Sequence, residues 1–148
     1  HTLIMVHEGP AALVEAETAA AADLAARMGL TPLPAAIVEH WLGHRNNVPP
    51  WNFILDRGIV ADTVEISATW DRIAAIYDAA VAGLKAIPGC LAASAHSSHV
   101  YRSGLNLYFT FAIQPADPHE MEPAYFEAWN RILTATAEGG GSLSHHHG

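Results

Sequence analysis

Residues 105–114 read Leu-Asn-Leu-Tyr-Phe-Thr-Phe-Ala-Ile-Gln, and this stretch decides the fold. Large apolar side chains stand at every second position, with polar ones between them: Leu105, Leu107, Phe109, Phe111 and Ile113 against Asn106, Tyr108 and Thr110. Successive side chains of a β-strand point to opposite faces of its sheet. The alternation therefore predicts a strand with one buried face and one polar face.

The segment before this strand is predicted to be its hairpin partner. Residues 91–102 read as a strand, and Ser103-Gly104 is a two-residue connection typical of tight hairpins. In that register His99 lies opposite Tyr108, Ser97 lies opposite Thr110, and Val100 and Ser98 join the face of Leu107 and Phe109. A three-residue loop would turn every side chain of the first strand to the other face. We prefer the two-residue loop because it groups the polar side chains.

A further strand is predicted over residues 59–67. Its two faces alternate, with Val60, Val64 and Ile66 on the apolar one and Thr63, Glu65 and Ser67 on the polar one. Asp62 falls on the apolar face. A strand start or a capped turn explains that position more simply than a catalytic role.

Helical spacing and cap signals place the remaining elements. We expect a strand over 2–7, a helix over 10–28, a shorter helix around 37–42, an irregular stretch over 44–50, a helix from Trp70 to about 88, and a last helix from the Asp117-Pro118 cap to Glu138. The order β-α-α-β-α-β-β-α predicts the α+β class, an antiparallel sheet with helices packed on one face. The other face, with Tyr108 and Glu65, would meet water or a second domain across an active site.

Composition excludes several classes of protein. The chain has 148 residues, 51% of them hydrophobic and 15% charged, which suits one folded domain. Its formal net charge of -8 disfavours a nucleic-acid partner. No apolar run is long enough for a membrane span. A single cysteine, Cys90, excludes a disulfide framework, and we expect it to be a buried small residue.

Three adjacent histidines, His145, His146 and His147, stand near the end of the chain. A purification tag is one interpretation, but Leu143 interrupts the glycine-serine stretch and Gly148 follows only three histidines. As chemistry, adjacent imidazoles fan out, so that one contacts a ligand while another contacts a second element. They offer poor tetrahedral geometry for a metal, and His96 and His99 would lie on opposite faces of their strand. We therefore expect no metal site.

The two ends of the chain suggest a segment of a larger protein. The chain opens without Met on an apolar run, and it has no charged leader with a small-residue cleavage site. It contains no glycine-rich phosphate loop and no local signature of Ser-His-Asp or Cys-His catalysis.

Four stretches resemble one family in order and spacing: residues 62–71, 98–101, 104–111 and 140–148 with the triple histidine. Together they resemble the alkyldihydroxyacetonephosphate synthase-type FAD-linked oxidases of the vanillyl-alcohol-oxidase superfamily, over nearly the whole chain. The resemblance implies that residues 1–148 form a ferredoxin-like cap domain with FAD as cofactor. It also implies an FAD-binding domain that precedes this region in the family and is absent from the chain.

The resemblance also implies roles for individual residues. Tyr108 matches the family's acid/base tyrosine, and His145, His146 and His147 match the histidine loop at the flavin and substrate. His99 and Arg45 are substrate-binding candidates. In the synthase-type members an arginine before the stretch that matches 62–65 helps to hold the substrate phosphate. Residues 49–53, Pro-Pro-Trp-Asn-Phe, contain none, and Arg45 or Arg57 stands at the wrong spacing to replace it.

A related branch, the FAD-linked 2-hydroxy-acid dehydrogenases, has Glu-His-Gly where this chain has residues 146–148. Its metal-binding members use two hairpin histidines. Here His99 matches one of them and Tyr108 stands in the place of the other, which again predicts no metal.

Three functions follow from the sequence. The first is the cap of an FAD-dependent oxidoreductase that oxidises a small alcohol, a phenol-like compound or a hydroxy acid. The second is alkyl transfer through a flavin adduct, and the third is a non-enzymatic metal-binding module. For the first we expect a cytoplasmic bacterial-type enzyme with a small-molecule substrate, its own FAD-binding domain as partner, and a homodimer as one assembly.

Overall fold

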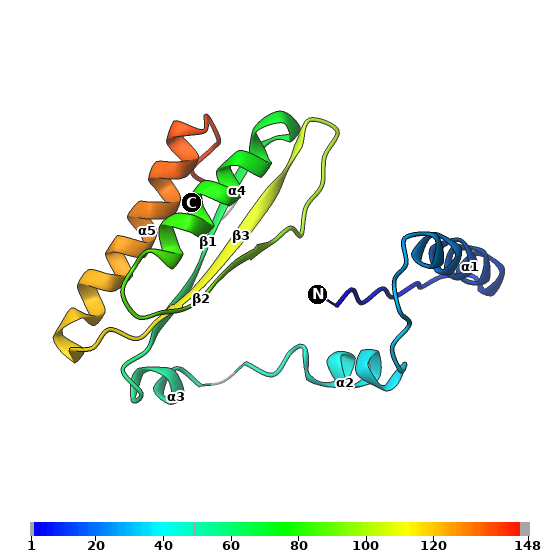
Figure 1. The fold of residues 1–148 in the computed structure, drawn as a ribbon, viewed down its shortest axis with the longest axis horizontal. Coiled ribbons are helices and arrows are strands. Elements are labelled where there is room, and N and C mark those ends of the chain that lie inside the picture. The colour runs from blue at the N-terminus through cyan, green and yellow to red at the C-terminus, as the bar shows by residue number, and fades with distance from the viewer. Residues whose placement is uncertain (1, 49, 146–148) are drawn as a thin grey trace. The chain divides into compact units, whose positions relative to one another are not determined.

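A computed structural model describes residues 2–48 and 50–145 and divides the chain into two units, residues 1–48 and 49–148 (Figure 1). The first unit holds helices α1 (Ala11–Arg27) and α2 (Ala36–His44), which confirms both predicted helices. Neither helix has a buried residue. The strand expected over residues 2–7 is wrong, because this stretch has no regular structure. A strand needs a neighbour for its hydrogen bonds, and the described sheet pairs only segments of the second unit.

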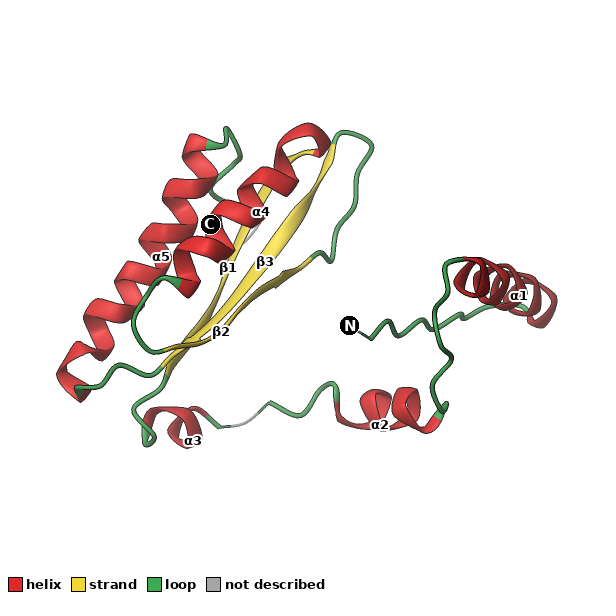
Figure 2. Ribbon diagram, in the orientation of Figure 1, coloured by secondary structure: helices red, strands yellow, loops and turns green. Residues whose placement is uncertain are grey.

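The second unit contains the sheet and the helices that cover it. Its elements are α3 (Trp51–Leu55), β1 (Val60–Thr69), α4 (Trp70–Lys85), β2 (Cys90–His96), β3 (Gly104–Ile113), the 3-10 turn η1 (Pro118–Glu120) and α5 (Met121–Glu138). The strands are antiparallel in the order β1-β3-β2. Helices α4 and α5 lie together on one face of the sheet (Figure 2). The predicted α+β class is therefore confirmed. Helix α3 was not predicted, and it follows Pro50 directly.

The core lies between β3 and the two helices. Phe109, Phe111 and Ile113 are fully buried, as the alternation predicted. Ile76 of α4 and Ile132 of α5 pack into the same cluster. Each such side chain contributes roughly 1.5–3 kcal/mol through removal of apolar surface from water.

The pairing of β1 with β3 separates an apolar face from a polar one. Val64 lies opposite Phe109 and Ile66 opposite Leu107 on the helix side. On the other side Glu65 lies opposite Tyr108, and Ser67 lies opposite Asn106. The polar faces of two strands distant in sequence thus meet in the middle of the sheet.

The predicted register of the hairpin is wrong. His96, not His99, lies opposite Tyr108, and Ser94, not Ser97, lies opposite Thr110. A shift of three residues, an odd number, exchanges the two faces of the first strand. Residues 97–103 instead leave the ladder as a loop closed by a single bridge between Val100 and Leu105, and Val100 is 66% exposed rather than in the core. The physical cause is Asn106, whose side chain takes the hydrogen bonds that a continuous ladder would have formed.

The Asp62 carboxylate accepts hydrogen bonds from side chains of α5 and does not cap a turn. Its Oδ2 accepts hydrogen bonds from the Tyr125 hydroxyl at 2.7 Å and from Trp129 Nε1 at 3.3 Å. Its Oδ1 accepts from the backbone N–H of Thr63. A carboxylate on the helix-covered face is tolerated because each of its oxygens has a donor.

The two caps around the last helix differ in kind. At its start Asp117 accepts from the backbone N–H of His119 at 2.9 Å and so caps the 3-10 turn η1 that leads into α5, whereas α5 itself begins after Glu120 without a side-chain cap. At its end residues 139–141 turn the chain back, and Ser142 exchanges two backbone hydrogen bonds with Ser67. This bridge lies at the free edge of β1, where a ferredoxin-like sheet places its fourth strand. It brings His145 onto the sheet.

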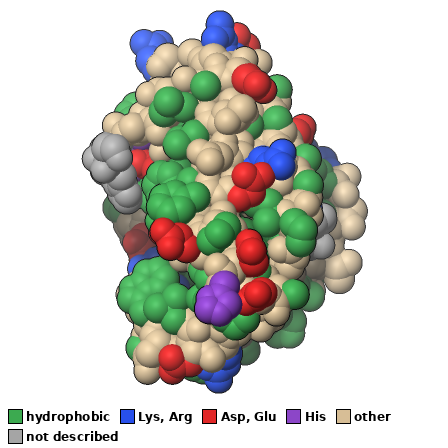
Figure 3. All heavy atoms as spheres, turned by 90° about the vertical axis from the view of Figure 1, so that its left-hand side faces the viewer, with side chains coloured by type: hydrophobic (Ala, Val, Ile, Leu, Met, Phe, Trp, Pro, Cys, Tyr) green, Lys and Arg blue, Asp and Glu red, His purple; other side chains and the backbone are tan. Residues whose placement is uncertain are grey.

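The surface agrees with the composition. Acidic side chains are scattered over the face that carries α5 (Figure 3), in keeping with the formal net charge of -8. Cys90 is only partly buried. No helix among the described residues is both long and apolar enough to cross a membrane.

Candidate functional site

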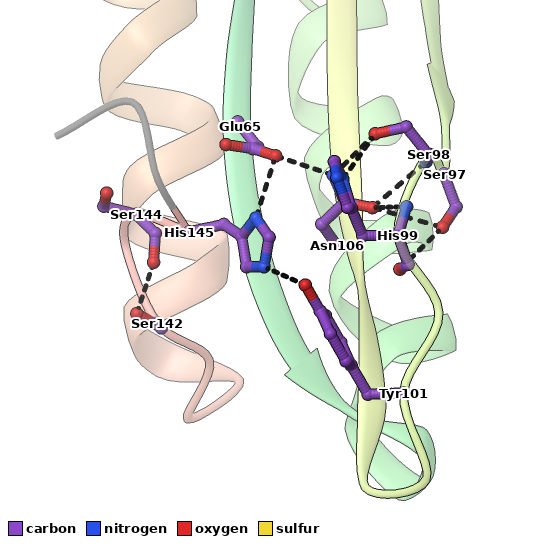
Figure 4. Close-up of polar contacts among 9 residues, drawn as sticks. All are labelled: Glu65, Ser97, Ser98, His99, Tyr101, Asn106, Ser142, Ser144 and His145. Atoms are coloured by element: carbon purple, nitrogen blue, oxygen red, sulfur yellow. Dashed lines mark hydrogen bonds and ion pairs between the residues drawn. The ribbon is translucent and has the colours of Figure 1, made fainter.

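Two buried polar side chains form the base of the site on the helix-free face of the sheet. The Glu65 side chain is fully buried, and so is Asn106 on the neighbouring strand. Asn106 Nδ2 donates to Glu65 Oε1 at 2.6 Å (Figure 4). A buried carboxylate is costly without such donors, so this pair makes the site possible.

Asn106 also shapes the loop that covers it. Its Oδ1 accepts from the backbone N–H groups of Ser98 at 3.1 Å and His99 at 2.8 Å, and from Ser97 Oγ at 3.2 Å. Its Nδ2 donates to Ser98 Oγ as well. One amide thus folds residues 97–99 over the polar face and sets His99 beside it.

His145 reaches the site from the C-terminal segment. Its Nδ1 lies 3.2 Å from Glu65 Oε1, and its Nε2 lies 3.1 Å from the Tyr101 hydroxyl (Figure 4). Its ring centroid is 5.2 Å from that of His99. The structure therefore brings together His145 and His99, two of the predicted residues, through a carboxylate and a tyrosine that the sequence analysis did not assign.

Tyr108 lies between Glu65 on β1 and His96 on β2. Its ring stacks on that of His96 at a centroid distance of 5.2 Å. Loss of hydration and the negative charge of Glu65 raise the pKa of the Tyr108 phenol above its ordinary value. At neutral pH Tyr108 therefore keeps its proton and can donate a hydrogen bond.

Three side chains of the site are of the kind that bind metal ions. Glu65, His99 and His145 each offer one ligand atom, and these atoms lie within 4.8 Å of one another. Asn106 Nδ2, however, already donates to Glu65 and lies 3.5 Å from His99 Nδ1. The Asn106 amide nitrogen thus lies within 3.5 Å of one ligand atom of each of those two residues. The described residues thus satisfy the carboxylate by hydrogen bonding.

The other predicted site residues lie elsewhere or outside the described residues. His146 and His147 are among the residues that the structure does not describe. Arg45 belongs to the first unit, where its guanidinium lies 5.3 Å from the Trp41 ring centroid. Arg57 follows α3 and places its guanidinium 3.8 Å from the Phe53 ring centroid.

Sequence reasoning missed Tyr101 and the pairing of Glu65 with Asn106. The sequence analysis placed Glu65 and Asn106 on the polar faces of their strands, so residue type and strand face already marked both as candidates for a polar site. The adjacency of the two strands that brings them together did not follow from periodicity. Tyr101 stood in one of the stretches that resemble the family, but no role was assigned to it, because its place depends on the loop around Asn106.

Within residues 50–145 the fold and this face define a class: an α+β domain with helices α4 and α5 on one face of the sheet and imidazoles, phenols and a buried carboxylate on the other. The chain belongs to the family described as FAD linked oxidases, C-terminal domain, whose profile matches residues 1–148. FAD is thus the cofactor that the family uses.

Individual relatives agree. The chain is 30% identical to alkyldihydroxyacetonephosphate synthase of Dictyostelium discoideum over 152 aligned positions, which cover 98% of this chain and 24% of the relative. It is 28% identical to the FAD-linked oxidoreductase YgcU of Escherichia coli K12, over 99% of this chain and 33% of that protein. A solved structure of alkyldihydroxyacetonephosphate synthase shares the fold, with a TM-score of 0.64 at 22% identity over 90% of this chain and 25% of its own. The chain spans a quarter to a third of these relatives.

Proposed function

We propose that this chain is the substrate-side cap of an FAD-dependent oxidoreductase that oxidises a small alcohol, a phenol-like compound or a hydroxy acid. The observation that carries the proposal is Tyr108, a protonated phenol on the open polar face next to the buried Glu65. An FAD-binding domain, outside this chain, would complete the enzyme. FAD, when bound, supplies the acceptor for the hydride of the substrate.

The residues of this chain suit that task. Tyr108 donates a hydrogen bond to the substrate oxygen, and its phenolate form, the minor one at neutral pH, takes the proton of the substrate hydroxyl as general base. The stacked ring of His96 limits the rotation of the Tyr108 side chain. His99 and His145 lie on the same face with their rings 5.2 Å apart, and His145 holds the Tyr101 hydroxyl through its Nε2.

In this proposal the polar face of the sheet lies against one side of the flavin ring and does not enclose the cofactor. A flat sheet face with imidazoles and phenols can cover one side of an isoalloxazine ring. The chain carries no glycine-rich loop for the diphosphate. We propose that His145, His146 and His147 approach the ring and that the other domain holds the rest of the cofactor.

The test uses the complete protein. Its visible spectrum should show a flavin band, and Tyr108→Phe should keep that band while slowing flavin reduction by roughly 10²–10⁴-fold, the usual contribution of a general acid/base. Tyr77→Phe on α4 is the matched control because its ring packs on the helix-covered side. A missing band would reject the flavoenzyme class, and an unchanged rate in Tyr108→Phe would reject its role.

Alkyl transfer through a flavin adduct is the second candidate, and the similarity to a relative named alkyldihydroxyacetonephosphate synthase favours it. That reaction needs a guanidinium for the substrate phosphate. Arg57 donates to the Phe53 carbonyl oxygen, and Arg45 lies over Trp41, so both are engaged within their own segments. Bleaching of the flavin by acyl-dihydroxyacetone phosphate, compared with simple alcohols, would separate the two reactions.

A further inference from the structure

We infer that a hollow beside Tyr101 and His145 is a binding pocket for a hydroxylated small molecule, with Tyr101 as its hydrogen-bond acceptor and with Glu65 and His145 as positioning residues. The hollow has a volume of about 300 Å³ and is lined by Tyr101, His145, Ser67, Thr69 and the backbone of residues 140–142. Its size suits a small ligand. This inference rests on the proposed function, because the ligand would be the substrate of the same site.

Glu65 determines which nitrogen of His145 carries the proton. The carboxylate of Glu65 only accepts hydrogen bonds, and its Oε1 already accepts one from Asn106. A ring nitrogen 3.2 Å from that oxygen must therefore be the donor, so a neutral His145 carries its single proton on Nδ1. Its Nε2 is then an acceptor.

The tautomer of His145 in turn determines the direction of the hydrogen bond that the Tyr101 hydroxyl makes. Since Nε2 is an acceptor 3.1 Å away, the Tyr101 hydroxyl donates its proton to it. The lone pairs of the Tyr101 oxygen then remain for a second partner. Tyr101 is 49% exposed, so an outside ligand can reach that oxygen, and the partner it can take there is a hydrogen-bond donor such as an alcohol O–H.

The backbone holds this chain of hydrogen bonds in place. The N–H of Tyr101 donates to the carbonyl of Gly104 at 2.8 Å, and its carbonyl accepts from Trp70 Nε1 at 3.1 Å. On the other side the two backbone bonds between Ser142 and Ser67 fix the segment that carries His145. Tyr101 and the segment that carries His145 are thus hydrogen-bonded to the sheet before any ligand binds. This lowers the conformational entropy that is lost on binding.

Tyr101 and Tyr108 would then have complementary roles. Tyr108 keeps its proton and can donate a hydrogen bond to a ligand. Tyr101 donates its proton to His145, so it can only accept a hydrogen bond from a ligand. A ligand hydroxyl can donate to the Tyr101 oxygen, whereas an ether or a ketone without an O–H cannot. Tyr101, which lines the hollow, therefore favours hydroxyl compounds there.

The test is nitrogen NMR of the complete protein with ¹⁵N-labelled histidine, with the signal of His145 assigned from its loss in His145→Gln. We expect a protonated Nδ1 and an acceptor Nε2 in the wild type. Glu65→Gln should lose the Nδ1–H preference, whereas Tyr101→Phe should keep it and shift only Nε2. A protonated Nε2 in the wild type would overturn the inference.

The ligand is tested with benzyl alcohol as the probe. Its addition should shift the Nε2 signal of His145 in the wild type and in Tyr77→Phe but not in Tyr101→Phe. No shift in the wild type would reject the pocket. Stoichiometric zinc chloride that shifts both His99 and His145 would instead make the cluster a metal site and overturn the inference.

These outcomes are distinct from failure of the proposed function. A flavin band in every variant shows that the class of enzyme stands and that each variant is folded. A lost band in the wild type would reject the flavoenzyme, whereas the tautomer of His145 is read without any turnover. Where Glu65→Gln fails to fold, Tyr101→Phe still decides whether the hydroxyl bonds to Nε2.

Discussion

Asp62 and Glu65 are both carboxylates on β1, and their neighbours give them different tasks. Asp62 faces the helices and accepts from two aromatic side chains of α5. Glu65 faces the open side and accepts from Asn106, with an imidazole nitrogen next to the same oxygen. The first arrangement joins a helix to the sheet, and the second belongs to the candidate site. Residue type alone did not distinguish them.

Asp62→Ala should destabilise the fold by about 1–3 kcal/mol, because it leaves the Tyr125 hydroxyl and the Trp129 N–H without their acceptor. Urea unfolding at neutral pH measures the loss. Asp23→Ala on α1 is a suitable control since its only described ion pair, with Arg27, is exposed. Equal stability of Asp62→Ala and wild type would contradict a structural role.

The same substitution should change a titration. The hydrogen bond to Asp62, then desolvation and the charge of Asp62, raise the pKa of the Tyr125 phenol above its ordinary value. This contribution to stability is complete below about pH 10 and is lost as the pH rises from there through the folded pKa. In Asp62→Ala the pKa of Tyr125 should fall towards 10, the ordinary value. Ultraviolet titration of tyrosinate, with Tyr125→Phe to assign the signal, reports the shift, and an unmoved signal would contradict it.

At the scale of elements, the start of β3 shows how closely two strands approach. A Cβ on Gly104 would overlap the backbone carbonyl oxygen of Ala68 on β1. The strands can therefore pair up to their ends only with glycine at this position. The sequence analysis placed Gly104 in a turn, and its actual task is this close approach.

Gly104→Ala should cost about 1–3 kcal/mol, because a backbone carbonyl cannot move away without breaking the ladder. Gly83→Ala is the matched control. Its new Cβ would meet only the flexible Arg131 side chain at 3.4 Å, and alanine favours a helix interior by up to about 1 kcal/mol. Thermal unfolding followed by circular dichroism should lower the Tm of the first variant and raise that of the second. A Tm of Gly104→Ala at or above the wild-type value would contradict the strand contact.

At the scale of the whole molecule, the buried core belongs to one unit. All buried hydrophobic residues lie between Val60 and Ile132, and neither α1 nor α2 contributes one. A unit with its own core can fold alone. The second unit also carries every described residue of the candidate site.

A fragment of residues 49–148 should therefore unfold cooperatively, with a Tm within roughly 5 °C of the full chain, which corresponds to about 1 kcal/mol for a domain of this size. Circular dichroism on heating measures it. Phe109→Ala in this fragment should cost about 3–5 kcal/mol, whereas Phe126→Ala, at a side chain that is 55% exposed, should cost far less. A fragment without a cooperative transition would show that the first unit is required for folding.

The sequence by itself determined the class of fold, the helices α1, α2, α4 and α5, and the two faces of β1 and β3, because periodicity of two or 3.6 residues is a local property. It also determined that Tyr108 and Glu65 lie on polar faces. Only the tertiary structure decided which polar residues meet. Asn106 draws residues 97–99 out of the ladder and so shifts the hairpin by three residues, and the Ser67–Ser142 bridge brings His145 onto Glu65. The first depends on side-chain hydrogen bonds across one hairpin and the second on backbone bonds between residues distant in sequence, and neither is encoded in a periodicity of two or 3.6 residues.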